Sequence, residues 1–314
     1  MDNVLECRNL TKRYGNDAPA LADVSLSIRT KGVFALLGRN GAGKTTLIRI
    51  LATELAPSSG SASVNGMDVM SDARKIREQI AVMPQEARLV PWLTPRQSIY
   101  SYLLYRGFSR SEAASKVAGA LERLGLGKYE NTLNRRLSGG VKRRVLMTMV
   151  LATDAKILFV DEPTTGLDPV IRADLWTMLN ELKKTHFIFL TTHYLEEAER
   201  LADMIGILEN GKLLSLGSLD QLRSAVKYPY SIRILEGGPV ETKVGEVIKN
   251  SDGSTQIFTT EEDAERLSEQ LVEEKKRFSI YPISLEDIFY YLVRKPIEED
   301  TRRNLTERID VNED

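Results

Sequence analysis

The stretch Gly38-Arg39-Asn40-Gly41-Ala42-Gly43-Lys44-Thr45-Thr46 decides the fold of this chain. It fits the pattern G-x-x-x-x-G-K-[ST] of a loop that binds phosphate groups. The apolar run before it, Val33–Leu37, predicts a buried strand, and the apolar spacing after it predicts a helix. Glycines let backbone N–H groups approach an anion, and the helix N-terminus adds positive potential. The sequence therefore predicts a phosphate site on an α/β core, where Lys44 reaches the β- and γ-phosphates of a nucleotide and Thr45 ligates Mg²⁺.

The composition of the chain excludes several classes of protein. Its 314 residues suit about two domains. The formal net charge is −1, so no global basic field attracts the chain to nucleic acid or to an anionic membrane. The single cysteine, Cys7, follows an apolar pair and is expected to be a packing residue in a reducing compartment. No run approaches about 18 apolar residues, and Met1-Asp2-Asn3 does not begin a signal peptide, so we expect a cytoplasmic protein that acts at membranes only through a partner.

The segment that follows the phosphate loop changes from strand to helix character. Asn65-Gly66 predicts a tight hairpin turn, and Ile80–Met83 predicts a strand that ends at Pro84-Gln85. From about residue 86 to 150 the pattern favours helices, which indicates a helical insertion in the α/β core. The insertion begins with the stretch Leu89-Val90-Pro91-Trp92-Leu93-Thr94-Pro95, which is apolar and interrupted by prolines. Two interpretations are open: the stretch packs the insertion on the core, or it forms a docking groove for another protein.

Polar residues mark the ends of predicted strands and the start of a helix. Ser138 precedes Gly139-Gly140 as the N-cap of a predicted helix, and this helix start is a second possible anion site. Taken alone the signal is weak, because many helices begin with serine and glycine. An apolar strand ends in Asp161-Glu162, where one acid would lie near a metal ion and the other could polarise an attacking water. A further strand ends at His193, at the same edge of the predicted sheet.

After about residue 227 the sequence predicts a separate small domain. Strand patterns occur at 231–235, 243–248, 255–259 and 277–281, with an acidic helix at 260–276 and an amphipathic stretch at 283–292. We expect an ATP-binding domain at 1–227, a small domain for regulation or dimerisation at 228–294, and a charged, disordered tail at 295–314.

The order of these motifs resembles that of the ATP-binding-cassette (ABC) ATPases over about residues 4–230. The motifs that carry the resemblance are the phosphate loop, Tyr14, Gln85, Leu137–Val141, Ile157–Glu162, Gly166-Leu167-Asp168 and His193. The resemblance implies an α/β fold: a P-loop NTPase core with an N-terminal antiparallel β subdomain, a helical insertion subdomain and a small C-terminal α+β domain. It also implies ATP and Mg²⁺ as cofactors.

The resemblance implies a role for each candidate site residue. ATP contacts are expected from Tyr14, Gly38, Arg39, Asn40, Gly41, Ala42, Gly43, Lys44, Thr45 and Thr46, and Mg²⁺ contacts from Thr45, Gln85 and Asp161. Glu162 is expected to be the general base, while Gln85 and His193 sense the γ-phosphate. The signature residues Ser138, Gly139 and Gly140 are expected to meet the ATP of a second subunit. Asp168 is expected to be the acid of a loop that contacts the second subunit itself. Tyr14 would stack on adenine, although taken alone such a residue is more often a half-buried loop aromatic.

The signature motif departs from the usual LSGGQ at one position, where Val141 replaces glutamine. The residues that follow resemble the LSGGMKRR form of exporters of the daunorubicin-resistance and sodium-extrusion type, and Ser284–Phe289 resembles the C-terminal part of that subgroup. Val141 affects the polar contact expected from its own position, not the anion site of Ser138 and the glycines.

The leading interpretation is the ATP-hydrolysing subunit of a membrane exporter. It would form a head-to-tail dimer with a second copy and would bind a separate transmembrane permease at the inner face of the cell membrane. The alternative is a soluble ATPase that acts on nucleic acid or the ribosome. In the wider superfamily of these ATPases, the members that act in DNA repair and on chromosomes carry a long coiled coil between the phosphate loop and the acids. Lys44 and Asp161 lie too close in this sequence to contain such a coiled coil. A purely regulatory cassette would be expected to have lost Glu162 or Lys44, so we expect a transport ATPase with no nucleic-acid partner.

Overall fold

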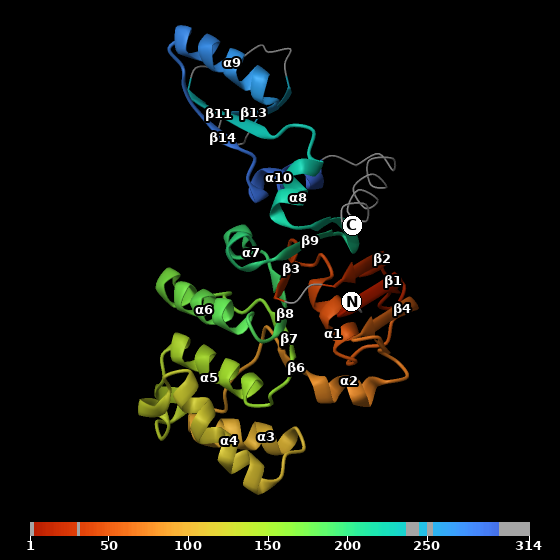
Figure 1. The fold of residues 1–314 in the computed structure, drawn as a ribbon, viewed down its shortest axis with the longest axis vertical. Coiled ribbons are helices and arrows are strands. Elements are labelled where there is room, and N and C mark those ends of the chain that lie inside the picture. Colours follow the sequence, from red (N-terminus) through yellow and green to blue (C-terminus); the bar gives the residue numbers. More distant parts are fainter. Residues whose placement is uncertain (1–2, 30–31, 237–244, 250–253, 295–314) are drawn as a thin grey trace. The chain divides into compact units, whose positions relative to one another are not determined.

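The computed structural model describes residues 3–29, 32–236, 245–249 and 254–294. The chain divides into two compact units, 1–213 and 214–314 (Figure 1). The domain boundary expected after residue 227 comes later in the sequence than this division, because helix α8 (Leu219–Ala225) falls in the second unit. The tail 295–314, expected to be disordered, lies outside the described residues.

A six-stranded sheet carries the phosphate loop. Its strand order is β10-β9-β3-β8-β7-β6, with β3 parallel to β8 and β9, and β7 parallel to β6 and β8. The strands are β3 (Val33–Leu37), β6 (Ile80–Met83), β7 (Ile157–Asp161), β8 (Phe187–Thr192), β9 (Met204–Glu209) and β10 (Lys212–Gly217). Every residue of β3, β7 and β8 is buried, which explains why β3 is apolar throughout and why β7 and β8 are apolar until the polar residues at their carboxyl ends. Because the carboxyl ends of parallel strands share one edge of a sheet, the residues that follow β3, β7 and β8 meet there.

A four-stranded antiparallel sheet, in the order β2-β1-β4-β5, forms the N-terminal subdomain. Its strands are β1 (Leu5–Lys12), β2 (Leu21–Ile28), β4 (Ser59–Val64) and β5 (Met67–Asp68). Asn65 and Gly66, with φ of 48° and 72°, make the predicted hairpin turn between β4 and β5. Cys7 is buried, and this burial, with the neighbouring Glu6 carboxylate, raises the pKa of its thiol to about 12. The predicted packing role of Cys7 is confirmed.

Seven α-helices of the first unit are described: α1 (Lys44–Leu51), α2 (Ala73–Gln79), α3 (Pro95–Tyr105), α4 (Arg110–Arg123), α5 (Gly139–Leu151), α6 (Pro169–Leu182) and α7 (Leu195–Leu201). Helices α3, α4 and α5 form the helical insertion and share one apolar core (Figure 1). Capping boxes at Thr94 and Ser109 fix the first residues of α3 and α4. Ser138 caps α5 by accepting from the backbone N–H of Val141 at 3.4 Å, as the sequence predicted.

The second unit is a small α+β structure. Its antiparallel sheet, in the order β12-β13-β11-β14, consists of β11 (Tyr230–Glu236), β12 (Glu246–Lys249), β13 (Thr255–Thr259) and β14 (Arg277–Pro282). Helix α9 (Glu261–Glu273) packs Ala264, Leu267 and Leu271 on this sheet, and α10 (Leu285–Arg294) contacts α8. Part of the strand expected at 243–248 lies outside the described residues. Within the described segments, no helix combines the length and the apolar character needed to cross a membrane.

Candidate active site

The phosphate loop joins β3 to α1 in a shape that requires glycine. Gly43 has φ of 110°, and a Cβ there would lie 2.3 Å from the carbonyl oxygen of Ala20, so any other residue would be strained and would clash. Gly41 has φ of 83° and open space at its Cβ position. Gly43 is also the N-cap of α1, and no side chain closes the N-terminus of that helix. The loop residues 38–46 thus form the predicted strand, turn and helix start, an arrangement that fits a phosphate group.

Lys44 and Glu162 form a buried ion pair at the centre of the site. The Lys44 Nζ lies 3.0 Å from the Glu162 Oε1, and the two side chains are only 5% and 6% exposed. The Lys44 Nζ also donates to the carbonyl oxygens of Gly38 and Arg39, at 2.8 and 3.2 Å. Little water can screen charges at this depth, so the two side chains strongly influence each other.

Several polar side chains converge on the other carboxylate oxygen of Glu162. Gln85 Nε2 and Thr165 Oγ1 each donate to Oε2 at 3.1 Å, and His193 Nδ1 lies 3.0 Å from it. Burial opposes ionisation of this carboxyl, but Lys44, His193 and Thr165 outweigh it, so the pKa of Glu162 lies below its ordinary value. Glu162 is therefore ionised at neutral pH, in the form that can accept a proton.

Asp161 faces the first residues of α1. It is buried, its Oδ2 accepts from Thr45 Oγ1 at 2.8 Å, and its Oδ1 accepts from Thr191 Oγ1. Consecutive residues of a regular strand point to opposite faces, yet Asp161 and Glu162 contact adjacent residues of α1, Thr45 and Lys44. The left-handed backbone of Glu162, with φ of 44°, ends the alternation and turns both acids toward the phosphate loop.

The donor set of Thr45 and Asp161 fits Mg²⁺. This ion prefers oxygen ligands and, in nucleotide sites, takes only a few from the protein, with phosphate and water supplying the rest. In the part of the chain that the structure describes, no three His, Cys, Asp or Glu side chains gather into a metal site made of protein alone. The amide nitrogen of Gln85, the third expected ligand, contacts Glu162.

Tyr14 lies beside the end of the phosphate loop. Its hydroxyl is 3.5 Å from Thr46 Oγ1, and 43% of the residue is exposed. The ring is therefore both partly packed and accessible to a flat ligand.

Ser138 and Asp168 cap helices. Asp168 begins α6 by accepting from the backbone N–H groups of Val170 and Ile171, at 3.1 and 3.0 Å. A Cβ on Gly140 would lie 2.8 Å from the Ile171 side chain, so the first turns of α5 and α6 pack closely and require glycine at this position. The signature helix and the Asp168 helix are thus brought together, whereas the contacts around Glu162 come from other residues.

Three contributors to the site were not identified from the sequence. Thr191 is the penultimate residue of β8, so the rule that parallel strand ends meet could have found it, and Thr165 follows Glu162 in the same loop. Arg143 of α5 donates from Nε to the carbonyl oxygen of Pro163 at 2.6 Å, and from Nη2 to that of Glu162 at 3.0 Å. No sequence signal indicated Arg143, since a basic run after a helix start is normally solvated.

Comparisons with known proteins agree with this fold and site. The sequence matches the family described as "ABC transporter" over residues 21–165. The daunorubicin resistance ATP-binding protein DrrA3 of Streptomyces coeruleorubidus is 37% identical over 224 residues, 71% of each chain. The Nod factor export ATP-binding protein I of Rhizobium etli is 34% identical over 299 residues, 94% of each chain. The solved structure of cbiO1 from Clostridium perfringens, described as part of the ABC transporter complex cbiONQ, has a TM-score of 0.63 and 27% identity, covering 69% of this chain and 89% of that one.

The similarity to DrrA3 and to the Nod factor protein extends over most of their lengths, and the solved structure of cbiO1 shares the fold. The chain belongs to the ABC transporter family and has the fold of its ATP-binding proteins. Other relatives are much longer: the chain spans between 27% and 34% of four ABC transporter A family members from Dictyostelium discoideum and Arabidopsis thaliana.

Proposed function

We propose that this chain is the ATP-hydrolysing subunit of an exporter, and that it couples MgATP binding and hydrolysis to a separate membrane permease. The observation that carries the proposal is the buried Lys44–Glu162 pair at the phosphate loop, with Gln85 and His193 on the same carboxylate. The names of the relatives, which refer to drug resistance and to Nod factor export, support export as the direction. The protein would then lie on the inner face of the cell membrane through its permease.

In the proposed reaction Glu162 accepts a proton from the water that attacks the γ-phosphate, while Lys44 binds the β- and γ-phosphates. Thr45 and Asp161 would hold Mg²⁺, which supplies neutralisation of phosphate charge when bound. The same Lys44 ammonium that lowers the pKa of Glu162 would be shared with the phosphates. Their negative charge opposes ionisation of Glu162, so ATP binding would raise its basicity and prepare it for proton transfer.

Replacing Lys44 by alanine tests this proposal at the binding step. The loss of a charge-assisted contact with the phosphates is expected to weaken MgATP binding by about 10- to 100-fold. The measurement is a titration with a fluorescent ATP analogue. Lys116→Ala, which removes a lysine paired with Asp154 on the insertion, is the matched control and should bind normally. Unchanged affinity in Lys44→Ala would contradict the assignment of this loop as the nucleotide site.

The apolar stretch at the start of the insertion contains both residues that pack on the protein and residues that are exposed to solvent, so each of the two interpretations applies to part of it. Leu89 packs against both the insertion core and the core around the central sheet. Trp92, in contrast, is 72% exposed, and Val90 is 40% exposed. Leu89 thus packs the insertion on the core, and we propose that Trp92 contacts another protein.

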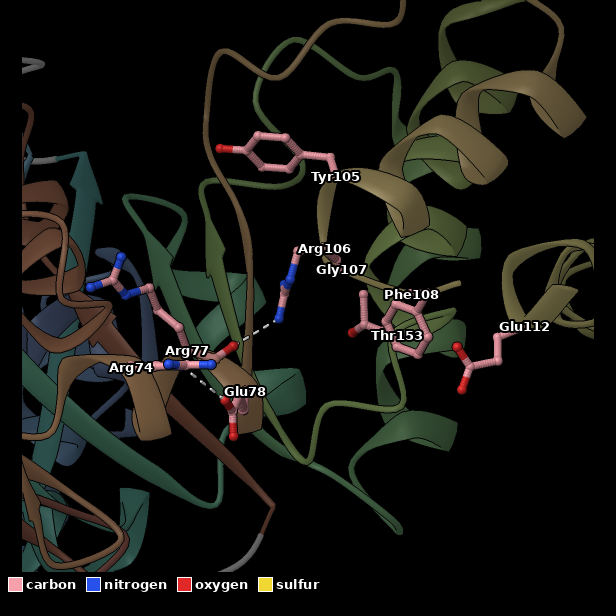
Figure 2. A pocket seen from close by; sticks show the side chains of 9 residues that line it. All are labelled: Arg74, Arg77, Glu78, Tyr105, Arg106, Gly107, Phe108, Glu112 and Thr153. Atoms are coloured by element: carbon pink, nitrogen blue, oxygen red, sulfur yellow. Dashed lines mark hydrogen bonds and ion pairs between the residues drawn. The ribbon is translucent and has the colours of Figure 1, made fainter. Parts of the chain in front are cut away.

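A hollow of about 660 Å³ opens beyond the other end of α3 (Figure 2). Arg74 and Arg77 of α2 line one side of it, and the 86% exposed Tyr105 lines another. Arg106 bridges the core and the insertion, because its Nη2 donates to the carbonyl oxygens of Arg77 and Ile80, both at 2.8 Å. An exposed aromatic ring beside arginines suits a short helix with acidic and aromatic side chains. We propose that the permease presents such a helix to this hollow and to Trp92.

The docking proposal predicts that Trp92→Asp combined with Tyr105→Asp abolishes co-purification with the permease and leaves ATP hydrolysis by the isolated chain unchanged. Both side chains are exposed, so the substitutions should not disturb the fold. Val272→Asp, at another exposed apolar position, on α9, is the control and should retain the complex. A complex that survives the double substitution would place the contact elsewhere.

A further inference from the structure

Two N–H groups of the Arg143 guanidinium donate to main-chain carbonyl oxygens at the proposed base, Glu162, and at the residue after it. Its Nη2 donates to the carbonyl oxygen of Glu162 at 3.0 Å, and its Nε donates to that of Pro163 at 2.6 Å. The neighbouring Arg144 behaves as arginines usually do, since it pairs with the carboxylate of Asp174 at 2.9 Å. These two donors of Arg143 therefore recognise a particular backbone shape, although the Glu197 carboxylate also interacts with the charge of the guanidinium.

The backbone that Arg143 holds is strained. Glu162 has φ of 44°, a left-handed conformation that is unfavourable for a side chain with a Cβ. Such a conformation persists only when surrounding contacts fix it. The Glu162 N–H donates to the carbonyl oxygen and to the Oγ1 of Thr191, both at 3.1 Å. Thr191 thus fixes one side of the residue, and Arg143 fixes the other.

This backbone shape decides where the Glu162 carboxylate points. If the residue relaxed to an extended conformation, its side chain would leave the face shared with Asp161 and would lose its position at Lys44 and Gln85. Arg143 lies in the second turn of α5, the helix that begins at the signature residue Ser138. A rigid helix therefore connects the signature to the main chain of the base.

We propose that Arg143 is a positioning residue that holds Glu162 in its proton-accepting orientation and couples that orientation to the placement of the signature helix. This inference rests on the proposed function, in which Glu162 is the general base. Displacement of α5 would move the guanidinium away from the two carbonyl oxygens and would release the strained backbone. Proton transfer would then be efficient only while the signature helix is in place.

The test compares steady-state ATP hydrolysis by the wild type, Arg143→Ala and Arg143→Lys. We expect kcat to fall by about 10- to 100-fold in Arg143→Ala, the effect of misplacing a catalytic group by about 1 Å, with KM changed by less than about twofold. The affinity for MgATP, measured by fluorescence titration, should be unchanged, because Arg143 does not contact the phosphate loop residues that bind it. Arg143→Lys retains one charged donor and should recover part of the rate. Arg123→Ala is the control and should match the wild type, because Arg123 is an exposed arginine that lines a second pocket together with Arg143.

A double variant distinguishes positioning from a separate contribution to the rate. If Arg143 acts through Glu162, then Arg143→Ala has no further effect in the Glu162→Gln background. Multiplied losses in the double variant would overturn the proposal, as would an Arg143→Ala kcat within about twofold of the wild type. A lower thermal midpoint with normal turnover per nucleotide-binding site would assign Arg143 a purely structural role, which also overturns it. If Arg143→Ala does not fold, the same comparisons are made with Arg143→Lys. Wild-type turnover in Glu162→Gln alone would instead remove the proposed base, a failure distinct from that of Arg143.

Discussion

Glutamine in place of Glu162 is expected to slow ATP turnover by at least about 100-fold while MgATP still binds. The amide has nearly the same shape, and its oxygen can still accept from Lys44, but it cannot take a proton from water. The expected loss is large because Glu162 is the buried carboxylate whose pKa the surrounding site lowers, so its ionised form is already present at neutral pH. Phosphate release under steady state measures the rate, and nucleotide titration measures the binding.

The same chemical change at Glu54 provides the control. Glu54 is half-exposed and forms only a long ion pair, 3.9 Å, with Arg49, so Glu54→Gln should hydrolyse ATP like the wild type. Near-wild-type phosphate release from Glu162→Gln would exclude Glu162 as the general base. A loss of MgATP affinity in that variant would indicate instead that the carboxylate mainly holds Lys44 in place.

The fold could be predicted where a few adjacent residues determine the local structure. The apolar runs of β3 and β6 and the Asn-Gly turn after β4 lie at the residues that the sequence indicated. The cap residue Ser138 was equally visible, because N-capping depends on a few adjacent residues. The strand expected at Ile157–Glu162 was predicted one residue too long, because β7 ends at Asp161, before the left-handed backbone of Glu162.

The site could be predicted only in part. Lys44, Asp161 and Glu162 were identified because their motifs specify a strand end or a helix start. Arg143 was not, because its function depends on a contact with the main chain of a residue on another element, which side-chain patterns do not encode. The division between partly buried Leu89 and exposed Trp92 likewise depends on tertiary packing and not on hydrophobicity, which the two residues share.

The second large effect concerns assembly. The anion site at Ser138 begins a helix of the insertion, while the phosphate loop begins α1 on the central sheet, so one chain presents two separate surfaces for a nucleotide. Two copies related by a two-fold axis would let each signature contact the ATP of the other, and ATP would then favour the dimer because the dimer binds it more tightly. We expect Glu162→Gln, which retains ATP, to change from monomer to dimer when saturating MgATP is added.

Ser138→Arg in the Glu162→Gln background is expected to abolish this dimer, because bulk and a side chain that cannot cap α5 would replace the small hydroxyl at the helix start. Ser111→Arg, an identical change at an exposed position of α4, is the control and should leave the dimer intact. Light scattering of the full chain measures the oligomeric state of both variants. A dimer already present without nucleotide would point to the second unit as the contact. A Glu162→Gln protein that binds MgATP and stays monomeric would rule out the ATP-bridged dimer, since nothing else in the proposal would then bring a signature onto a bound nucleotide.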